Sequence, residues 1–224
     1  MMIREHLLQL LFPPKCVLCG RLLQKEETDL CHACRIHTPE FEESKIRLSF
    51  LAGWTALWYY MGDVRHSILK YKFYNARGYS AVYGRLLAMK LLSREFYRPD
   101  ILTWIPVSPA RKRERGYDQV ELIARAMSRE LGIDLTPTLK KIRHNPPQSG
   151  ITGVAQRKAN VLGAYRAIDP GGIRGKKILL LDDIITTGAT ASECARVLLT
   201  AGAGEVYCAA VAAAPHDRKS GPKE

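Results

Sequence analysis

Residues 176–190 read KKILLLDDIITTGAT, and this stretch decides the fold of the chain. The apolar run from Ile178 to Leu181 predicts a strand that is buried on both faces, as strands are in a parallel sheet. Asp182 and Asp183 are expected to end this strand. After a short loop, residues 191–199 have the apolar stripe of an amphipathic helix. Strand, acidic pair, loop and helix together predict an α/β fold with a parallel sheet flanked by helices.

The loop after the acidic pair has the composition of a phosphate site. Gly188 would let the backbone approach an anion closely, and the helix that follows offers unpaired N–H groups and a favourable dipole. Asp182 and Asp183 would repel a phosphate, so we expect them to accept hydrogen bonds from the vicinal hydroxyls of a ribose. The predicted binding residues of the loop are Ile184, Ile185, Thr186, Thr187, Gly188, Ala189 and Thr190.

The segment resembles the phosphoribosyl-diphosphate (PRPP) signature of type I phosphoribosyltransferases. The alternative is a buried strand whose polar end is simply solvated. Adjacent aspartates after a strand also occur in response regulators and phosphatase-like folds, but those do not place Thr-Thr-Gly-x-Thr at the start of the next helix. A P-loop would need a Gly-Lys-Ser/Thr that the chain lacks here. The sugar-phosphate interpretation is favoured.

The charge of the chain is concentrated on the part that carries this loop. The net charge is +12 over 224 residues, and 46% of the residues are apolar, enough for a sizeable core. Residues 65–129 hold fourteen basic and five acidic side chains, and residues 139–177 hold nine and one. This distribution favours a polyanionic partner such as a nucleotide, pyrophosphate or nucleic acid. The alternative is a basic surface that serves only solubility.

No stretch approaches the run of about 18 apolar residues that a membrane span requires. The N-terminal run Leu7 to Phe12 is short, and no small-residue cleavage site follows it, so a secretory signal is not expected. The sequence predicts a cytoplasmic protein.

Four cysteines near the N-terminus have the spacing of a zinc ribbon. Two CxxC motifs with eleven residues between them each bring two thiolates to one ion, which completes a tetrahedral structural Zn²⁺ site. Disulfides are the weaker alternative in a chain with no expected signal peptide. The predicted ligands are Cys16, Cys19, Cys31 and Cys34. Cys194 and Cys208 lie in apolar contexts and are expected to be small core residues.

A second basic segment follows the strand predicted over residues 100–107. It is expected to form a loop at the carboxyl end of that strand, where α/β sheets bind ligands. Arg111, Arg113 and Arg115 could clamp a pyrophosphate there, whereas the alternative is a solvated run of charges. A helix should follow, with Asp118 as N-cap and Gly132 at its end.

Residues 143–160 are polar and interrupted by proline and glycine, and the flanking runs 135–142 and 161–168 can pair as strands. A loop of this length in a compact domain is either a lid or disordered. As a lid, it would bring Arg143 and Arg157 over a bound diphosphate.

A four-cysteine ribbon, the basic RKRERGYDQ segment, the lid and the LLLDDIITTGAT segment occur in this order in the ComF (competence protein F) family, which this chain resembles over nearly its whole length. The resemblance implies two parts: an N-terminal helix and zinc ribbon over residues 1–45, and a type I phosphoribosyltransferase-like domain over residues 50–224. It also implies a cytoplasmic role in DNA uptake during natural transformation.

Two functions remain open at this point. In an enzyme, Asp182 and Asp183 would hold the ribose hydroxyls of PRPP, and Mg²⁺ would bridge ribose and pyrophosphate. Arg113, aided by Arg111 or Arg115, would then stabilise the departing pyrophosphate while an unknown nitrogen acceptor attacks C1. In a non-catalytic protein, the same site would bind a ribose phosphate, and the basic face and zinc ribbon would handle single-stranded DNA, together with proteins of the DNA-uptake machinery.

Overall fold

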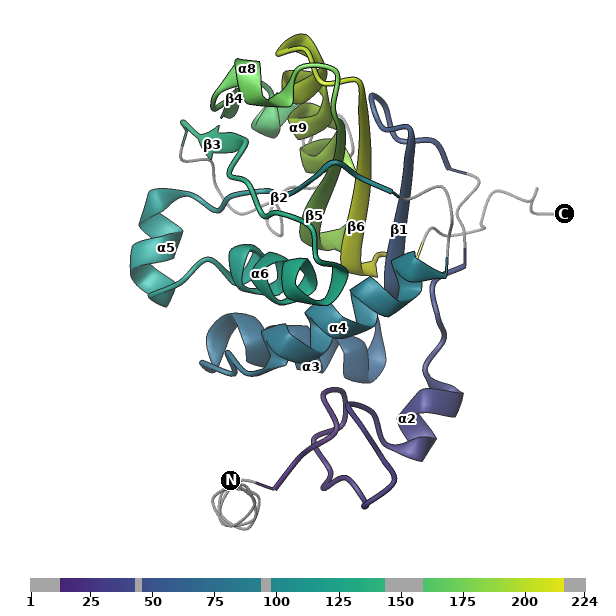
Figure 1. Ribbon diagram of the computed structural model, residues 1–224. Helices are drawn as coiled ribbons and strands as arrows, with labels where there is room; N and C mark the ends of the chain where they lie inside the picture. Colours follow the sequence, from purple (N-terminus) through teal and green to yellow (C-terminus); the bar gives the residue numbers. More distant parts are fainter. Residues whose placement is uncertain (1–12, 43–45, 94–97, 144–158, 216–224) are drawn as a thin grey trace, which may run out of the picture.

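The computed structural model describes residues 13–42, 46–93, 98–143 and 159–215 (Figure 1). In chain order its elements are α2 (His32–His37), β1 (Gly53–Tyr59), α3 (Gly62–Phe73), α4 (Tyr79–Leu92), β2 (Ile101–Trp104), α5 (Pro109–Arg115), α6 (Gln119–Leu131), β3 (Leu139–Lys141), β4 (Tyr165–Ala167), α8 (Pro170–Ile173), β5 (Lys177–Ile185), α9 (Ala189–Thr200) and β6 (Glu205–Ala213).

Four parallel strands form the main sheet in the order β1-β6-β5-β2. β5 lies inside it, paired with β6 and β2, and the predicted run from Ile178 to Leu181 is fully buried. Burying each of these aliphatic side chains contributes about 1.5–3 kcal/mol. A strand covered on both faces needs apolar residues at consecutive positions, which is why the run does not alternate with polar residues.

Helices cover the two faces of the sheet unequally (Figure 1). On one face, α3, α4 and α6 pack in one hydrophobic cluster that takes in Leu179 and Leu181 of β5. On the other face, α9 and the antiparallel β3–β4 hairpin pack in a second cluster that takes in Ile178 and Leu180. The pleat of β5 therefore sends alternate side chains into two separate cores.

The structure corrects two of the expected boundaries. β5 does not end at Leu181: it continues to Ile185, because Ile184 and Ile185 pair with the last two residues of β6. Asp182 and Asp183 thus belong to the strand, and α9 begins at Ala189.

The basic segment is also not a loop. Ser108 caps its first turn, and it forms the short helix α5.

Other elements lie where the sequence predicts them. Asp118 caps α6 by accepting hydrogen bonds from the N–H groups of Val120 and Glu121, and Gly132 ends the helix in the left-handed conformation. The runs on either side of the lid pair as β3 and β4, whereas residues 144–158 of the lid lie outside the described part of the chain.

The cysteine-containing segment packs against the body of the molecule beneath α3 and α4 (Figure 1). Val17 and Leu18 belong to the same hydrophobic cluster as these helices. Ser67 of α3 donates a hydrogen bond to the carbonyl of Val17, and Arg85 of α4 forms an ion pair with Asp29. Polar and apolar contacts together therefore fasten the segment to two helices of the body.

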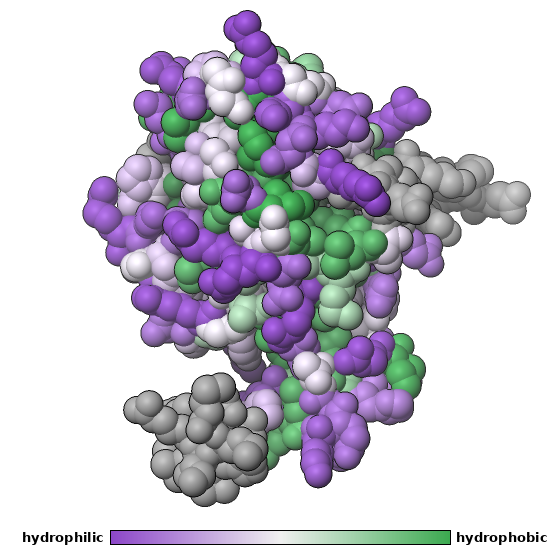
Figure 2. Space-filling view, in the orientation of Figure 1, coloured by the Kyte–Doolittle hydropathy of each residue, from purple (hydrophilic) through white to green (hydrophobic). Residues whose placement is uncertain are grey.

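Figure 2 shows that hydrophilic residues cover much of the viewed face, around α5 and α6, whereas apolar residues gather near its middle. Within the described residues, no helix is both long enough and apolar enough to span a bilayer.

The closest approach of α4 to α6 depends on Gly84. A Cβ atom there would lie 2.5 Å from the Cβ of Ala126 and 2.7 Å from the backbone nitrogen of Met127. Gly84→Ala should therefore lower the free energy of unfolding by about 1–3 kcal/mol through overpacking, although alanine favours helices. Thermal unfolding measures this effect. Gly78→Ala, where a Cβ meets nothing within 4 Å, is the control, and equal melting temperatures for both variants would contradict the packing.

Candidate functional site

The candidate site lies where β5 ends and α9 begins. Asp182 continues the series of Ile178 and Leu180, whose side chains face α9, and Asp183 continues the series of Leu179 and Leu181 on the opposite face. The pleat of one strand therefore gives two adjacent carboxylates different surroundings.

Asp183 is held by two residues from the helical layer beneath it. Lys72, in the last turn of α3, places its Nζ 2.8 Å from the Asp183 carboxylate, and Gln119 of α6 donates from Nε2 at 3.0 Å. Burial acts to raise the pKa of Asp183, but the charge of Lys72 and the two hydrogen bonds outweigh it and hold the pKa below its ordinary value. Asp183 is therefore an ionised and fixed group.

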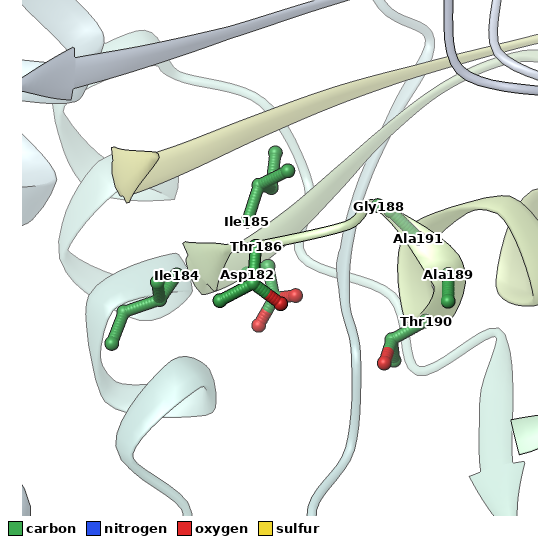
Figure 3. Close-up of a pocket in the computed structure, with 8 residues that line it drawn as sticks. All are labelled: Asp182, Ile184, Ile185, Thr186, Gly188, Ala189, Thr190 and Ala191. Carbon is green, nitrogen blue, oxygen red and sulfur yellow. The ribbon is translucent and has the colours of Figure 1, made fainter. Parts of the chain in front are cut away.

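Asp182 has no such cation at bonding distance among the described residues. Its Oδ1 accepts a hydrogen bond from the backbone N–H of Asp183 at 2.8 Å. Burial, and next the negative charge of Asp183, raise the pKa of Asp182 above the ordinary value. Figure 3 shows Asp182 and Thr186 at the end of the strand, with Thr190 across from them at the start of α9. Asp182 lines the hollow together with Thr186 and Thr190.

The connection from β5 to α9 has most of the geometry expected of an anion site. A small hollow is lined by Ile184, Ile185, Thr186, Gly188, Ala189 and Thr190, together with Asp182 and Ala191. Thr187 is not among the lining residues; its hydroxyl instead accepts from the N–H of Ala189 at 3.4 Å. All the predicted residues of this loop except Thr187 therefore line the same hollow.

The structure adds a packing reason for glycine at position 188. Its φ of +72° favours glycine, and a Cβ there would lie 2.4 Å from a methyl carbon of Leu48. Leu48 is buried, so the space beside the Cα of Gly188 holds an apolar side chain. Gly188 also lines the hollow, so the expectation that an anion approaches its backbone stays a prediction.

A larger cavity of about 570 Å³ opens beside the small hollow and shares Asp182, Ile184, Thr186 and Thr190 with it. Its walls come from α3, α5, α6, the β3–β4 hairpin and β5. Five of its lining residues are cationic: Arg65, Lys72, Arg111, Arg115 and Lys141. A cavity lined this way concentrates positive potential next to two carboxylates.

The predicted arginines divide between this cavity and the outer surface. Arg111 and Arg115 line the cavity, whereas Arg113 is exposed and does not. The cause is the helical form of α5: Arg111, Glu114 and Arg115 are three or four residues apart and share the face that lines the cavity, whereas Arg113 lies on another face. Arg143 is exposed and lies close to Gly163, and Arg157 lies outside the described residues.

Among the polar lining residues that sequence reasoning missed are Arg65, Lys72, Gln119 and Lys141. The ammonium of Lys141 lies 5.2 Å from the centre of the Tyr165 ring, and burial lowers its pKa. Lys72 lies in the last turn of α3, Gln119 directly follows the cap of α6, and Lys141 lies on β3 beside the lid. Gln119 and Lys141 could have been suspected from the sequence because each lies next to a predicted feature of the site. No such signal marked Lys72.

The four predicted zinc ligands come together. The sulfur atoms of Cys16, Cys19, Cys31 and Cys34 all lie within 4.8 Å of one another, and Cys19 and Cys31 are 3.7 Å apart. Tetrahedral Zn²⁺ with bonds of about 2.3 Å separates its sulfur ligands by about 3.8 Å. The four thiols therefore fit a structural zinc ion.

The two aspartates should respond oppositely to neutralisation. Folding raises the pKa of Asp182 above its unfolded value of about 4. Between these two pKa values the folded state loses stability as the pH rises, because the unfolded chain ionises more readily. The loss is complete once the pH passes the pKa of the folded state. Asp182→Asn should therefore raise the melting temperature, more at pH 8 than at pH 5. Asp183→Asn leaves Lys72 unpaired and should lower the free energy of unfolding by about 3 kcal/mol at pH 7. Shifts of the same sign in both variants would contradict the assignment.

Comparison with known proteins places these features in context. Residues 121–223 match the family described as phosphoribosyl transferase domain, and residues 7–45 match the double zinc ribbon domain. "Competence protein F" of Haemophilus influenzae is 26% identical over 86% of this chain and 82% of its own length. "Competence protein ComFC" of Streptococcus pneumoniae is 28% identical over 86% of this chain and 96% of its own.

"DNA utilization protein YhgH" of Salmonella typhimurium is 29% identical over 61% of this chain and 62% of its own length. The alignments with the first two relatives each span 86% of this chain. This chain is therefore a homologue of competence protein F, and along it the match to the double zinc ribbon domain precedes the match to the phosphoribosyl transferase domain.

Proposed function

We propose that this chain binds PRPP or a related ribose phosphate where β5 meets α9. The observation that carries the proposal is the placement of Asp182 beside Thr186 and Thr190 at the mouth of α9. A helix N-terminus with hydroxyl groups around it suits the 5′-phosphate. The carboxyl group of Asp182 suits the ribose hydroxyls. The carboxylate of Asp183 would accept a hydrogen bond from the same hydroxyls while it remains paired with Lys72.

The cations of the larger cavity suit the diphosphate. Arg111 and Arg115 lie on the face of α5 that lines the cavity, and the guanidinium group binds phosphate oxygens in a bidentate manner. Arg113, and Arg143 and Arg157 from the lid segment, are proposed to join them when a ligand is bound. Mg²⁺ is proposed to bind together with PRPP, held by the carboxylate oxygens of Asp182, and it would neutralise charge on the leaving pyrophosphate.

If the site is catalytic, it would transfer the phosphoribosyl group to nitrogen. The bond from C1 to the pyrophosphate oxygen breaks, pyrophosphate leaves with the electron pair, and a bond forms between C1 and the acceptor nitrogen. Arg111 and Arg115 stabilise the departing charge, while the paired Asp183 holds the ribose in place. PRPP-dependent release of pyrophosphate, screened over a metabolite panel, separates this enzyme from a protein that only binds.

Calorimetric titration of PRPP in the presence of Mg²⁺ tests the binding proposal. The wild type should release heat with a single site, and Asp182→Asn should lose at least tenfold in affinity because an amide cannot replace both acceptor oxygens. Asp134→Asn is the matched control, since this exposed aspartate lies beside the opposite end of the sheet. No heat with the wild type, or equal affinities for both variants, would refute the assignment.

A second function, binding of single-stranded DNA, is favoured by the cluster of cations around the larger cavity. The names of the relatives, a competence protein and a DNA utilization protein, support a role in DNA uptake during natural transformation. In that role the chain would act in the cytoplasm, with the zinc ribbon and basic face contacting DNA or proteins of the uptake machinery.

Salt dependence tests the DNA proposal. Replacing Arg111, Arg113 and Arg115 with glutamate should weaken binding of an oligonucleotide and reduce the slope of log K against log salt by about 0.7 for each lost phosphate contact. The control replaces three exposed arginines elsewhere, Arg129, Arg166 and Arg174, which gives the same change in net charge. Equal loss in both triple variants would show that general charge, and not the α5 face, is responsible.

A further inference from the structure

Two turns between helices lie side by side on the surface of the molecule (Figure 1). One turn joins α3 to α4, and the other joins α5 to α6. The hydroxyl of Tyr117 in the second turn donates a hydrogen bond to the carbonyl of Tyr71, near the end of α3. A Cβ atom at Gly116 would lie 3.3 Å from a terminal guanidinium nitrogen of Arg77. The two turns are therefore in direct contact.

The first turn exposes two aromatic side chains at consecutive positions. Phe73, the last residue of α3, is 62% exposed, and Tyr74 is 77% exposed. Phe73 lies at the edge of the larger cavity, whereas Tyr74 does not line it. Singly exposed apolar residues are ordinary on protein surfaces, but two adjacent open rings offer a partner a larger flat apolar area.

Two arginines are held beside these rings. The guanidinium carbon of Arg77 lies 4.6 Å from the centre of the Tyr117 ring, and its Nε donates to Oδ1 of Asn75 at 2.8 Å. The guanidinium carbon of Arg115 lies 5.0 Å from the centre of the Phe73 ring. Aromatic rings and an amide therefore position both cations without neutralising their charge.

The charges of these two arginines are available to an anion. Within the described residues neither forms an ion pair with a carboxylate, whereas Arg85 of α4 pairs with Asp29 and Arg125 of α6 pairs with Glu121. An anion at the two turns would therefore break no existing ion pair there. Open aromatic rings next to cations are the combination that holds the bases and phosphates of single-stranded nucleic acids.

We propose that the turn surface, formed by Phe73, Tyr74, Arg77 and Arg115, stacks the unpaired bases of single-stranded DNA. The inference rests on the proposed DNA-binding function and adds to it a contact with the bases, made outside the carboxylate site. The two rings stack on bases, and the two guanidinium groups contact the phosphates between them. Because the bases of a duplex are already stacked and paired, the turn surface selects single strands.

Comparison of an oligothymidine with an abasic strand of the same length isolates the contribution of the bases, because both strands carry the same phosphates. In fluorescence anisotropy at fixed salt, the wild type should bind the oligothymidine about 25-fold more tightly, as expected for two stacked bases. Tyr74→Ala should lower this ratio about fivefold, and the double variant Phe73→Ala/Tyr74→Ala should bring it to about one. An unchanged affinity for the abasic strand shows that the variants are folded.

Phe50→Ala is the matched control. Its ring is 52% exposed, and its neighbours Leu48 and Leu51 pack in the second hydrophobic cluster, on the other face of the sheet. This variant should keep the wild-type ratio, and Tyr74→Trp should keep it as well.

Three results would refute the turn surface and leave the DNA proposal standing. They are equal affinity of the wild type for the oligothymidine and the abasic strand, an unchanged ratio in Tyr74→Ala, and a duplex of the same length that binds as tightly as the single strand. An equal loss in Phe50→Ala and Tyr74→Ala would also refute the surface. If the wild type binds no strand, the DNA proposal fails together with the inference.

Discussion

The ion pair between Lys72 and Asp183 joins the sheet to the helical layer at the candidate site. Two bonded groups, Lys72 from α3 and Gln119 from α6, converge on one carboxylate of β5. A buried carboxylate without such partners would be protonated or would destabilise the fold. Its neighbour, Asp182, faces the other side of the sheet and carries the opposite shift in pKa. The difference follows from the two-residue period of a strand.

α3 connects this ion pair to the zinc ribbon. Near its end it supplies Lys72 to the site, and one and a half turns earlier it supplies Ser67, which bonds to Val17 and to Tyr83. Tyr71, between the two, donates to the carbonyl of Gln119 and so ties α3 to the start of α6. The ribbon, α3 and the carboxylate site are therefore parts of one packed unit, although the cysteines and the aspartates lie far apart in the sequence.

Much of this architecture could be predicted because it depends on local patterns. The apolar run before Asp182, the cap at Asp118 and the paired CxxC motifs each have a short-range physical cause, and the structure contains each of them. Partners from distant elements could not be predicted. Nothing local in the sequence indicates that Lys72 reaches Asp183 or that Leu48 fills the space at Gly188. The helix α5, by contrast, has local signals in Ser108, Pro109 and Gly116 that the prediction of a loop overlooked.

One strand gives its two adjacent carboxylates opposite electrostatic environments. Carbon-13 NMR of the aspartate side chains, with resonances assigned through Asp182→Asn and Asp183→Asn, measures both pKa values directly. We expect Asp182 to titrate above the ordinary aspartate range and Asp183 below it. Two carboxyl groups that both titrate near about 4 would contradict it.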